Sequence, residues 1–239
     1  MPRIASLLAL ALLALPAAAQ PTDWAAHWRR RVEQFRRENR ELDPAARRVV
    51  LVGDSLTEGW GSRGRLAKFL PELAGRVIER GIASDGVGVR ERGVKNRLAE
   101  SALDCGPEQV VLLIGINDIG RDGSGVRPCL RAYREVVEEL RRRLPDVPLH
   151  LVTLPPARGG YAALNPHVVT FNRELAKLAA ETGSRLIDLH RELADERGEL
   201  PAALTGDGLH WNDAGYERVG KLLQRSLAAR GAVDRLEER

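Results

Sequence analysis

Short apolar runs alternate with longer amphipathic segments along most of the chain. Five of the runs are predicted as strands, at residues 48–52, 76–78, 110–114, 149–153 and 185–187. They are too continuously apolar for a sheet with one face in water, a pattern typical of parallel strands buried on both faces. Apolar residues at helical spacing predict helices at residues 63–70, 90–103, 131–144, 168–182 and 213–230. The alternation predicts an α/β fold, a three-layer α/β/α sandwich with a mainly parallel sheet.

The first residues have the features of an export signal. Arg3 gives a positive start, residues 4–15 form an apolar run, and residues 16–19 end in the small-residue pattern that signal peptidase accepts. We expect residues 1–19 to be the signal peptide, with cleavage before Gln20 and export of a single domain, 20–239, to the periplasm or the medium. An uncleaved membrane anchor is the alternative, but this run is shorter than the roughly 20 residues of a span. No stable membrane insertion of the mature chain is expected.

A helix is predicted over residues 22–40, because Thr22 or Asp23 can cap it. Four apolar residues then recur at helical spacing: Trp24, Trp28, Val32 and Phe35. We expect this aromatic stripe to serve packing rather than ligand binding.

The net charge is +4, and the basic residues are nearly all arginine. Arginine runs at 29–31 and 141–143 lie in helical patterns with glutamates nearby, which favours solvated helix faces, and no nucleic-acid partner is expected. Cys105 and Cys129 would both enter an oxidising compartment, but a predicted strand separates them, so the sequence leaves their pairing open. Neither cysteine has the spacing of a metal or redox motif.

Chemically active residue types cluster where ligands bind in parallel α/β sheets, after the carboxyl ends of strands. Ser55 follows the first predicted strand, at the start of a helix. A role as helix N-cap is enough to explain a serine there, so its use as a nucleophile requires a base from elsewhere in the chain.

Asp207 and His210 provide such a base and a group that orients it. They lie three residues apart in the loop before the last helix, so the carboxylate can accept the Nδ1 proton of the imidazole while Nε2 faces Ser55. The other histidines are expected to be surface or packing residues: His27, His150, His167 and His190.

Asn117 follows the third predicted strand and can present its side-chain N–H groups to a developing oxyanion. A role in closing an Asx turn is the alternative for this residue.

Three motifs together resemble the SGNH, or GDSL, hydrolase superfamily. They are GDSL at 53–56, GIND at 115–118 and DGLHWNDAGY at 207–216. The resemblance implies a flavodoxin-like five-stranded parallel sheet and ester hydrolysis without a cofactor or metal. It implies Ser55, Asp207 and His210 as catalytic residues, and Asn117 with the backbone N–H of Ser55 as parts of the oxyanion hole.

The glycine motif of the superfamily is altered in this chain. The segment 80–85 is similar to it, but Ser84 stands where a glycine normally gives its backbone N–H to the oxyanion hole. Serine also has an N–H, so the donor is kept if Ser84 adopts the dihedral angles of the glycine. Otherwise Gly86 takes its place or one donor is lost.

The layout resembles the branch of platelet-activating-factor acetylhydrolases and carbohydrate acetylesterases, which implies short acyl groups on a carbohydrate or other small substrate. Trp60 and Trp211 flank the catalytic motifs and are candidates for stacking on a sugar, with local packing as the alternative. A lysophospholipase or thioesterase acting on longer acyl chains is the competing enzyme. A metal-dependent phosphoesterase and a non-catalytic binding protein are further alternatives, and the sequence predicts no oligomeric state.

Overall fold

The sheet of the computed structural model has five strands, all parallel, in the order β2-β1-β3-β4-β5. The strands are β1 (Arg48–Gly53), β2 (Val77–Gly81), β3 (Pro107–Leu113), β4 (Leu149–Val152) and β5 (Arg185–Ile187). The structure describes residues 22–120 and 125–228, and the predicted signal peptide, 1–19, lies outside the described residues. The predicted strands and the predicted three-layer fold are confirmed.

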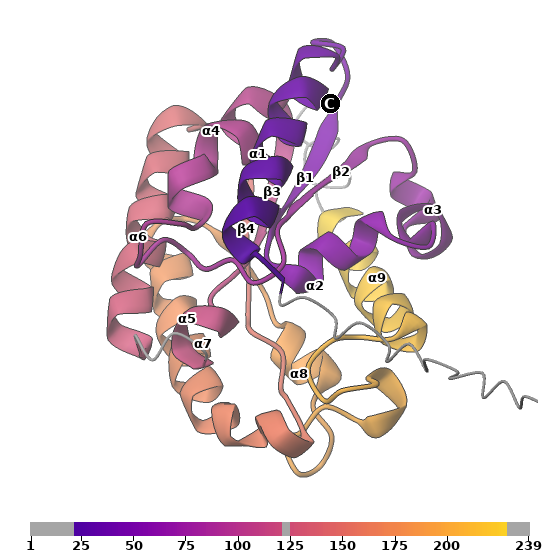
Figure 1. Cartoon of the computed structure of the whole chain (residues 1–239), viewed down its shortest axis with the longest axis vertical. Helices are drawn as coiled ribbons and strands as arrows, with labels where there is room; N and C mark the ends of the chain where they lie inside the picture. The colour runs from indigo at the N-terminus through magenta and orange to yellow at the C-terminus, as the bar shows by residue number, and fades with distance from the viewer. Residues whose placement is uncertain (1–21, 121–124, 229–239) are drawn as a thin grey trace, which may run out of the picture.

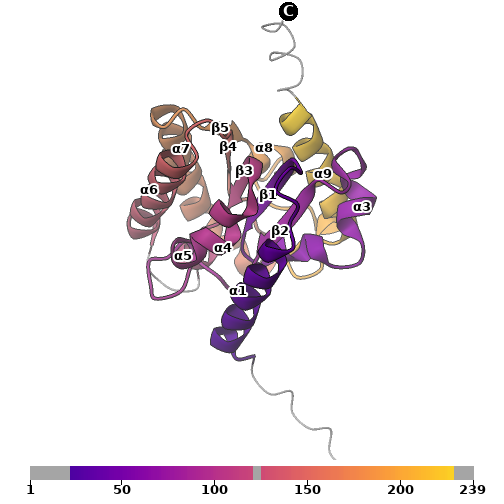
Figure 2. The same cartoon turned by 90° about the horizontal axis from the view of Figure 1, so that it is seen from above.

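Helices cover both faces of the sheet (Figures 1 and 2). One face carries α1 (Trp24–Arg40), α4 (Leu98–Ser101), α6 (Val126–Arg143) and α7 (Asn165–Glu181). The other face carries α3 (Arg65–Phe69), α8 (Leu189–Leu193) and α9 (Asp213–Ala228). Two further short helices, α2 (Ser55–Glu58) and α5 (Ile116–Gly120), begin just after β1 and β3.

The predicted helix at 90–103 is wrong in extent. The helical residues there are a 3₁₀ turn at Val94–Arg97, the four residues of α4 and Leu103, which begins a second 3₁₀ turn. The N–H of Val94 donates to the carbonyl of Gly86 at 2.9 Å, and that of Lys95 donates to Val87 at 3.0 Å. These backbone groups therefore bind the loop after β2 instead of extending a helix.

Burial on both faces holds only for the middle of the sheet. Every residue of β1 and β4 is buried, whereas Arg185 and Leu186 of the edge strand β5 are exposed. The aromatic stripe of α1 is also divided, since Val32 and Phe35 are buried against Ile82 while its first turn is only partly buried. The N-terminal end of α1 lies close to the carboxyl ends of β1 and β2 (Figure 1).

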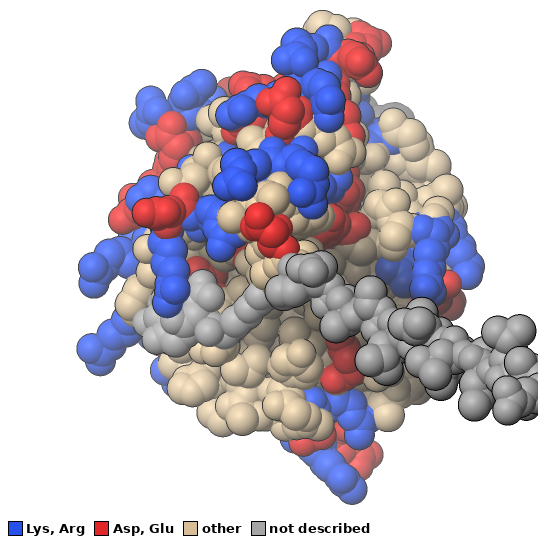
Figure 3. Space-filling model, in the orientation of Figure 1, with Lys and Arg blue, Asp and Glu red and all other residues tan. Residues whose placement is uncertain are grey.

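Charges of both signs are interspersed over α1 and α4, whereas the surface over α5 and the start of α7 is mostly uncharged (Figure 3). The expectation that both arginine runs are solvated is only partly right. Arg31 is ion-paired with Glu79 at 2.8 Å, and Arg141 donates to the carbonyl of Gly183 at 2.8 Å. These two side chains bind neighbouring elements because they lie on the inner edge of their helices.

Cys105 and Cys129 are both buried and form no disulfide. The thiol of Cys105 lies 3.5 Å from the carbonyl of Glu100, and that of Cys129 lies 3.9 Å from the carbonyl of Gly115. Within residues 22–120 and 125–228, no helix combines the length and the apolar composition that a membrane span requires.

Candidate active site

Ser55 begins α2 directly after the carboxyl end of β1. A Cβ at Gly53 would lie 2.1 Å from the Oγ1 of Thr57 and 2.3 Å from the carbonyl oxygen of Leu113, so only glycine fits where the chain turns. The Asp54 carboxyl caps α2 by accepting the N–H of Leu56 at 3.0 Å. This tight turn holds the Ser55 hydroxyl at the end of the sheet.

The loop before α9 brings His210 to Ser55. The Oγ of Ser55 lies 2.9 Å from Nε2 of His210, and Nδ1 of the same imidazole lies 2.6 Å from Oδ2 of Asp207. Because an ionised carboxylate only accepts hydrogen bonds, Nδ1 carries the proton and Nε2 accepts the Ser55 O–H. Ser55 and His210, 155 residues apart in sequence, thus form one hydrogen-bonded chain with Asp207.

Asp207 also shapes the loop that carries the imidazole. Its Oδ1 accepts the N–H groups of Leu209 and His210, at 2.9 and 2.8 Å. Partial burial acts to raise the pKa of Asp207, but the hydrogen bonds from the His210 imidazole and from the two N–H groups outweigh it and lower this pKa to about 2. The carboxylate of Asp207 is therefore ionised at neutral pH.

Residues after His210 fasten its loop to the segment around Ser55. The Tyr216 hydroxyl donates to the carbonyl of Leu56 at 2.9 Å. The guanidinium of Arg65 lies 4.1 Å above the Tyr216 ring and pairs with Asp213 at 3.0 Å. These contacts explain why the third motif continues six residues beyond the histidine.

Two further predicted site residues face the same place. The side-chain amide of Asn117, in α5, donates one N–H to the carbonyl of Asp85 at 2.8 Å, which leaves its second N–H to point elsewhere. Ser84 has a φ of +65°, in the left-handed region that favours glycine. Ser84 thus adopts a backbone conformation of the kind expected from the glycine motif, and Gly86 instead lies against the Asp118 carboxylate.

A cavity of about 590 Å³ opens in front of these groups. Four predicted site residues line it: Ser55, Ser84, Asn117 and His210. Most of the remaining wall is apolar or aromatic, with Trp24, Ile116, Tyr161, Leu164 and Leu209. Trp24 and Ser84 also line a second cavity of about 610 Å³, which includes Trp28 and Arg90.

A protein-family model for the GDSL-like lipase/acylhydrolase family matches residues 51–218. The chain belongs to this family. An acetylxylan esterase of Geobacillus stearothermophilus is 26% identical over 213 residues, covering 75% of this chain and 93% of the relative. Family membership and this relative identify the protein as a carboxylic ester hydrolase.

Solved structures share the fold of this GDSL-family esterase. A Streptococcus pneumonia protein provisionally named a platelet activating factor is similar with a TM-score of 0.74 at 23% identity, over 85% of this chain and 94% of that one. A GDSL-like lipase of Bacteroides thetaiotaomicron is similar with a TM-score of 0.70 at 18% identity, over 83% and 98% of the two chains.

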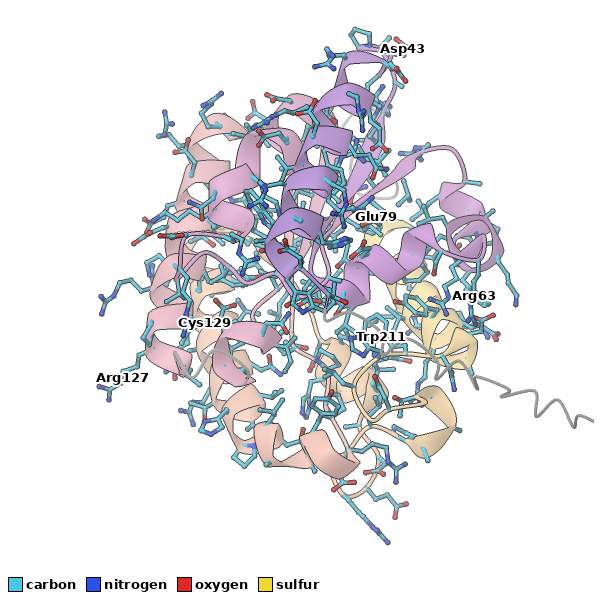
Figure 4. All side chains as sticks on the ribbon, viewed as in Figure 1. Asp43, Arg63, Glu79, Arg127, Cys129 and Trp211 are labelled. Atoms are coloured by element: carbon cyan, nitrogen blue, oxygen red, sulfur yellow. The ribbon has the colours of Figure 1, made fainter. Side chains whose placement is uncertain are left out.

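The two tryptophans of the GDSL-family motifs that were considered for sugar stacking are buried. Trp60 and Trp211 are 3% and 4% exposed, and both pack edge-on against Tyr216. Trp211 lies inside the molecule, near α9 (Figure 4). They pack the core beneath the site, so the interpretation as sugar-binding residues is wrong for both.

Trp24 and Tyr161 are aromatic residues of the cavity that sequence reasoning missed. The helical spacing of Trp24 with Trp28 predicted packing, yet Trp24 lines both cavities because α1 begins near the carboxyl ends of the strands. Arg97 and Asp85 were missed as well, and both are almost fully buried beside the site. No sequence signal separates Arg97 from the many other arginines of the chain.

Asp54, next to Ser55 in this GDSL-family protein, is a buried acid that is expected to make stability depend on pH. Burial raises the pKa of Asp54 to about 7, opposed by the Leu56 N–H and reinforced by the carboxylates of Asp85 and Asp118. Its Oδ2 has no hydrogen-bond partner among the residues that the structure describes.

Asp54→Asn is expected to gain stability relative to the wild type as the pH rises. The folded wild type keeps the Asp54 proton up to about pH 7, whereas the unfolded chain loses it near 3.8. The free energy of unfolding of the wild type therefore falls through this window, by roughly 4 kcal/mol at most. Asparagine keeps the cap on Leu56 and does not titrate. Urea unfolding of both proteins at several pH values measures the difference, and a difference that does not change with pH would contradict the prediction.

Proposed function

We propose that the protein is an exported serine esterase that hydrolyses short-chain acyl esters, above all acetyl esters, on a carbohydrate or other small substrate. One observation supports this proposal most strongly: the hydrogen-bonded chain from the Ser55 hydroxyl through His210 to Asp207 opens into a cavity that also holds Asn117 and Ser84. A nucleophile, a base, an orienting acid and oxyanion donors are thereby within reach of one ester carbonyl.

In the first half of the reaction, Ser55 Oγ attacks the carbonyl carbon while Nε2 of His210 takes its proton. Asp207 stabilises the imidazolium through the 2.6 Å hydrogen bond at Nδ1. The imidazolium then gives its proton to the alcohol oxygen as the C–O bond breaks, and an acyl-Ser55 ester remains.

In the second half, water replaces the alcohol. Nε2 of His210 takes a proton from the water as it attacks the acyl-enzyme, and returns it to Ser55 Oγ as the carboxylic acid leaves. In both halves, negative charge on the former carbonyl oxygen is stabilised by the N–H groups of Ser55 and Ser84 and by the second amide N–H of Asn117.

Acetyl esters of sugars are the proposed substrates, because the relative named above is an acetylxylan esterase. Trp24 and Tyr161 on the cavity wall offer aromatic faces for a sugar ring. A lysophospholipase or thioesterase is the second candidate, and it is favoured by the apolar walls from Ile116, Leu164 and Leu209, which suit a longer acyl chain.

A substrate panel with an active-site label tests this proposal. We expect a fluorophosphonate to modify Ser55, as found by peptide mass, and activity with p-nitrophenyl acetate to be indifferent to EDTA. Acetylated xylo-oligosaccharides are expected to have a higher kcat/KM than lysophospholipids or long-chain acyl thioesters. The reverse order would favour the second candidate, loss of activity with EDTA would favour metal-dependent chemistry, and absence of labelling would favour a binding protein.

Trp24→Ala tests how much the aromatic side chain of Trp24 contributes to binding the oligosaccharide. It is expected to raise KM for the oligosaccharide by about 10-fold while leaving KM for p-nitrophenyl acetate nearly unchanged, because only the larger substrate reaches α1. Export is tested separately, by finding whether the protein outside the cytoplasm begins at Gln20.

A further inference from the structure

Arg97 is a fully buried arginine, and three of its four hydrogen bonds go to the segments around the site. It is 0% exposed, and its Nε donates to Oδ2 of Asp85 at 2.7 Å. Its Nη2 donates to the carbonyl of Gly53 at 2.8 Å, and its Nη1 donates to the carbonyl of Arg80 at 2.8 Å and to the hydroxyl of Ser101 at 2.6 Å. Burying a guanidinium is costly unless its donors are satisfied in this way.

Two of these contacts fix the ends of β1 and β2. The Gly53 carbonyl lies two residues before Ser55, and the Arg80 carbonyl lies just before the turn that contains Ser84. The planar guanidinium holds both carbonyls at once, because its N–H groups diverge in a rigid fork. The backbone N–H of Ser55 and that of Ser84 are thereby set at a fixed separation.

The third contact, the one with Asp85, also positions the side-chain amide of Asn117. Asp85 follows Ser84, is 3% exposed, and has its carboxylate on Arg97 while its carbonyl accepts the amide of Asn117. Arg97 therefore reaches the third proposed oxyanion donor through one intermediate residue.

The conformation of Ser84 explains why this chain needs such a clamp. Ile82 to Asp85 form a turn closed by an N–H to carbonyl bond of 3.1 Å, and Ser84 has the left-handed φ in it. A serine is less stable than a glycine in that region, so a loosened turn would relax and carry the Ser84 N–H away. Neighbouring contacts oppose this: Glu58 accepts the N–H of Ala83, and Arg97 holds Asp85.

We propose that Arg97 is a positioning residue that holds the oxyanion hole together and keeps Ser84 in the conformation that the superfamily normally obtains from glycine. The inference rests on the proposed function, because it assigns Arg97 to the hole used by the Ser55 reaction. Arg97 touches no substrate, and it acts through Gly53, Arg80 and Asp85.

Arg97→Lys is the first test, since lysine keeps the positive charge but lacks the planar guanidinium with its diverging N–H groups. We expect kcat for p-nitrophenyl acetate to fall by about 10- to 100-fold with KM nearly unchanged, because the donors act mainly in the transition state. Ser101→Ala is the matched control. It removes the 2.6 Å bond to the same guanidinium but none of the bonds to the strand ends, so kcat is expected to stay within about twofold of the wild type.

Ser84→Gly in the Arg97→Lys background distinguishes a positioning role of Arg97 from a role in overall stability alone. Glycine needs no clamp to stay at positive φ, so the second substitution is expected to restore kcat by about fivefold or more. Ser84→Gly alone completes the double-mutant cycle, and thermal unfolding of all variants shows whether kcat follows the conformation of the turn or merely overall stability.

If Arg97→Lys does not fold, Asp85→Asn takes its place in the same cycle, because it weakens the ion pair and keeps the carbonyl that binds Asn117. A folded Arg97→Lys or Asp85→Asn protein with wild-type kcat would overturn the inference, as would an absent rescue or an equal loss in Ser101→Ala. Ser55→Ala in the same assay keeps the two proposals apart. An active Ser55→Ala protein removes the proposed function and this inference with it, whereas an inactive one beside a fully active Arg97→Lys protein removes the inference alone.

Discussion

Ser55→Ala and His210→Ala are each expected to lower kcat for p-nitrophenyl acetate by about 10⁴- to 10⁶-fold, and the double variant is expected to be no worse than either. In the proposed mechanism the hydroxyl and the imidazole act as one unit through the 2.9 Å hydrogen bond, so removing either one would leave the other without a function. Single-turnover kinetics with a long-lived acyl group checks the same point, since neither variant is expected to accumulate an acyl-enzyme.

Folding of these variants is the necessary control. Both side chains lie at the open end of the sheet, and that of His210 is 46% exposed, so their loss leaves the core packing around Trp211 and Tyr216 in place. Thermal unfolding is expected to shift by only a few degrees, as for substitutions at partly exposed sites. Wild-type turnover by either variant, or losses that add in the double variant, would rule out the serine mechanism as drawn.

The strands and the motif positions were predictable because both depend on local patterns. Central strands such as β1 and β3 are buried on both faces over residues 49–53 and 110–113, and these stretches hold no polar side chain. Parallel strands then place whatever follows them at one edge of the sheet, so Ser55 and Asn117 could be placed together from chain order alone.

Burial of individual polar and aromatic residues was not predictable in the same way. Trp60 is packed against Tyr216 while Trp24 lines the cavity, and the position of the start of α1 near the strand ends decides this for Trp24. Arg97 lies in the segment predicted as a helix at 90–103, but the backbone N–H groups of Val94 and Lys95 bind the loop after β2, and the side chain of Arg97 is fully buried. Such long-range contacts leave no periodic trace in the sequence.

Asn117→Ala is expected to lower kcat by about 10²- to 10³-fold with KM changed far less, which places the loss in the transition state. In the proposed oxyanion hole, the second amide N–H of Asn117 has its strongest partner only when the carbonyl oxygen becomes an anion, so substrate binding in the ground state is expected to lose little. Steady-state kinetics with p-nitrophenyl acetate gives the two parameters separately.

Asn117→Asp is the informative companion to that variant. It keeps the size of the side chain but replaces the donor by a carboxylate, which repels an oxyanion and also faces the Asp85 carbonyl that accepts the amide at 2.8 Å. We expect it to be at least as slow as the alanine variant at neutral pH and to gain kcat relative to the alanine variant at the same pH on acidification, when the carboxyl gains a proton and can donate again. An aspartate variant faster than the alanine variant at neutral pH, or an alanine variant whose KM rises as much as its kcat falls, would show that Asn117 binds the substrate without stabilising the oxyanion.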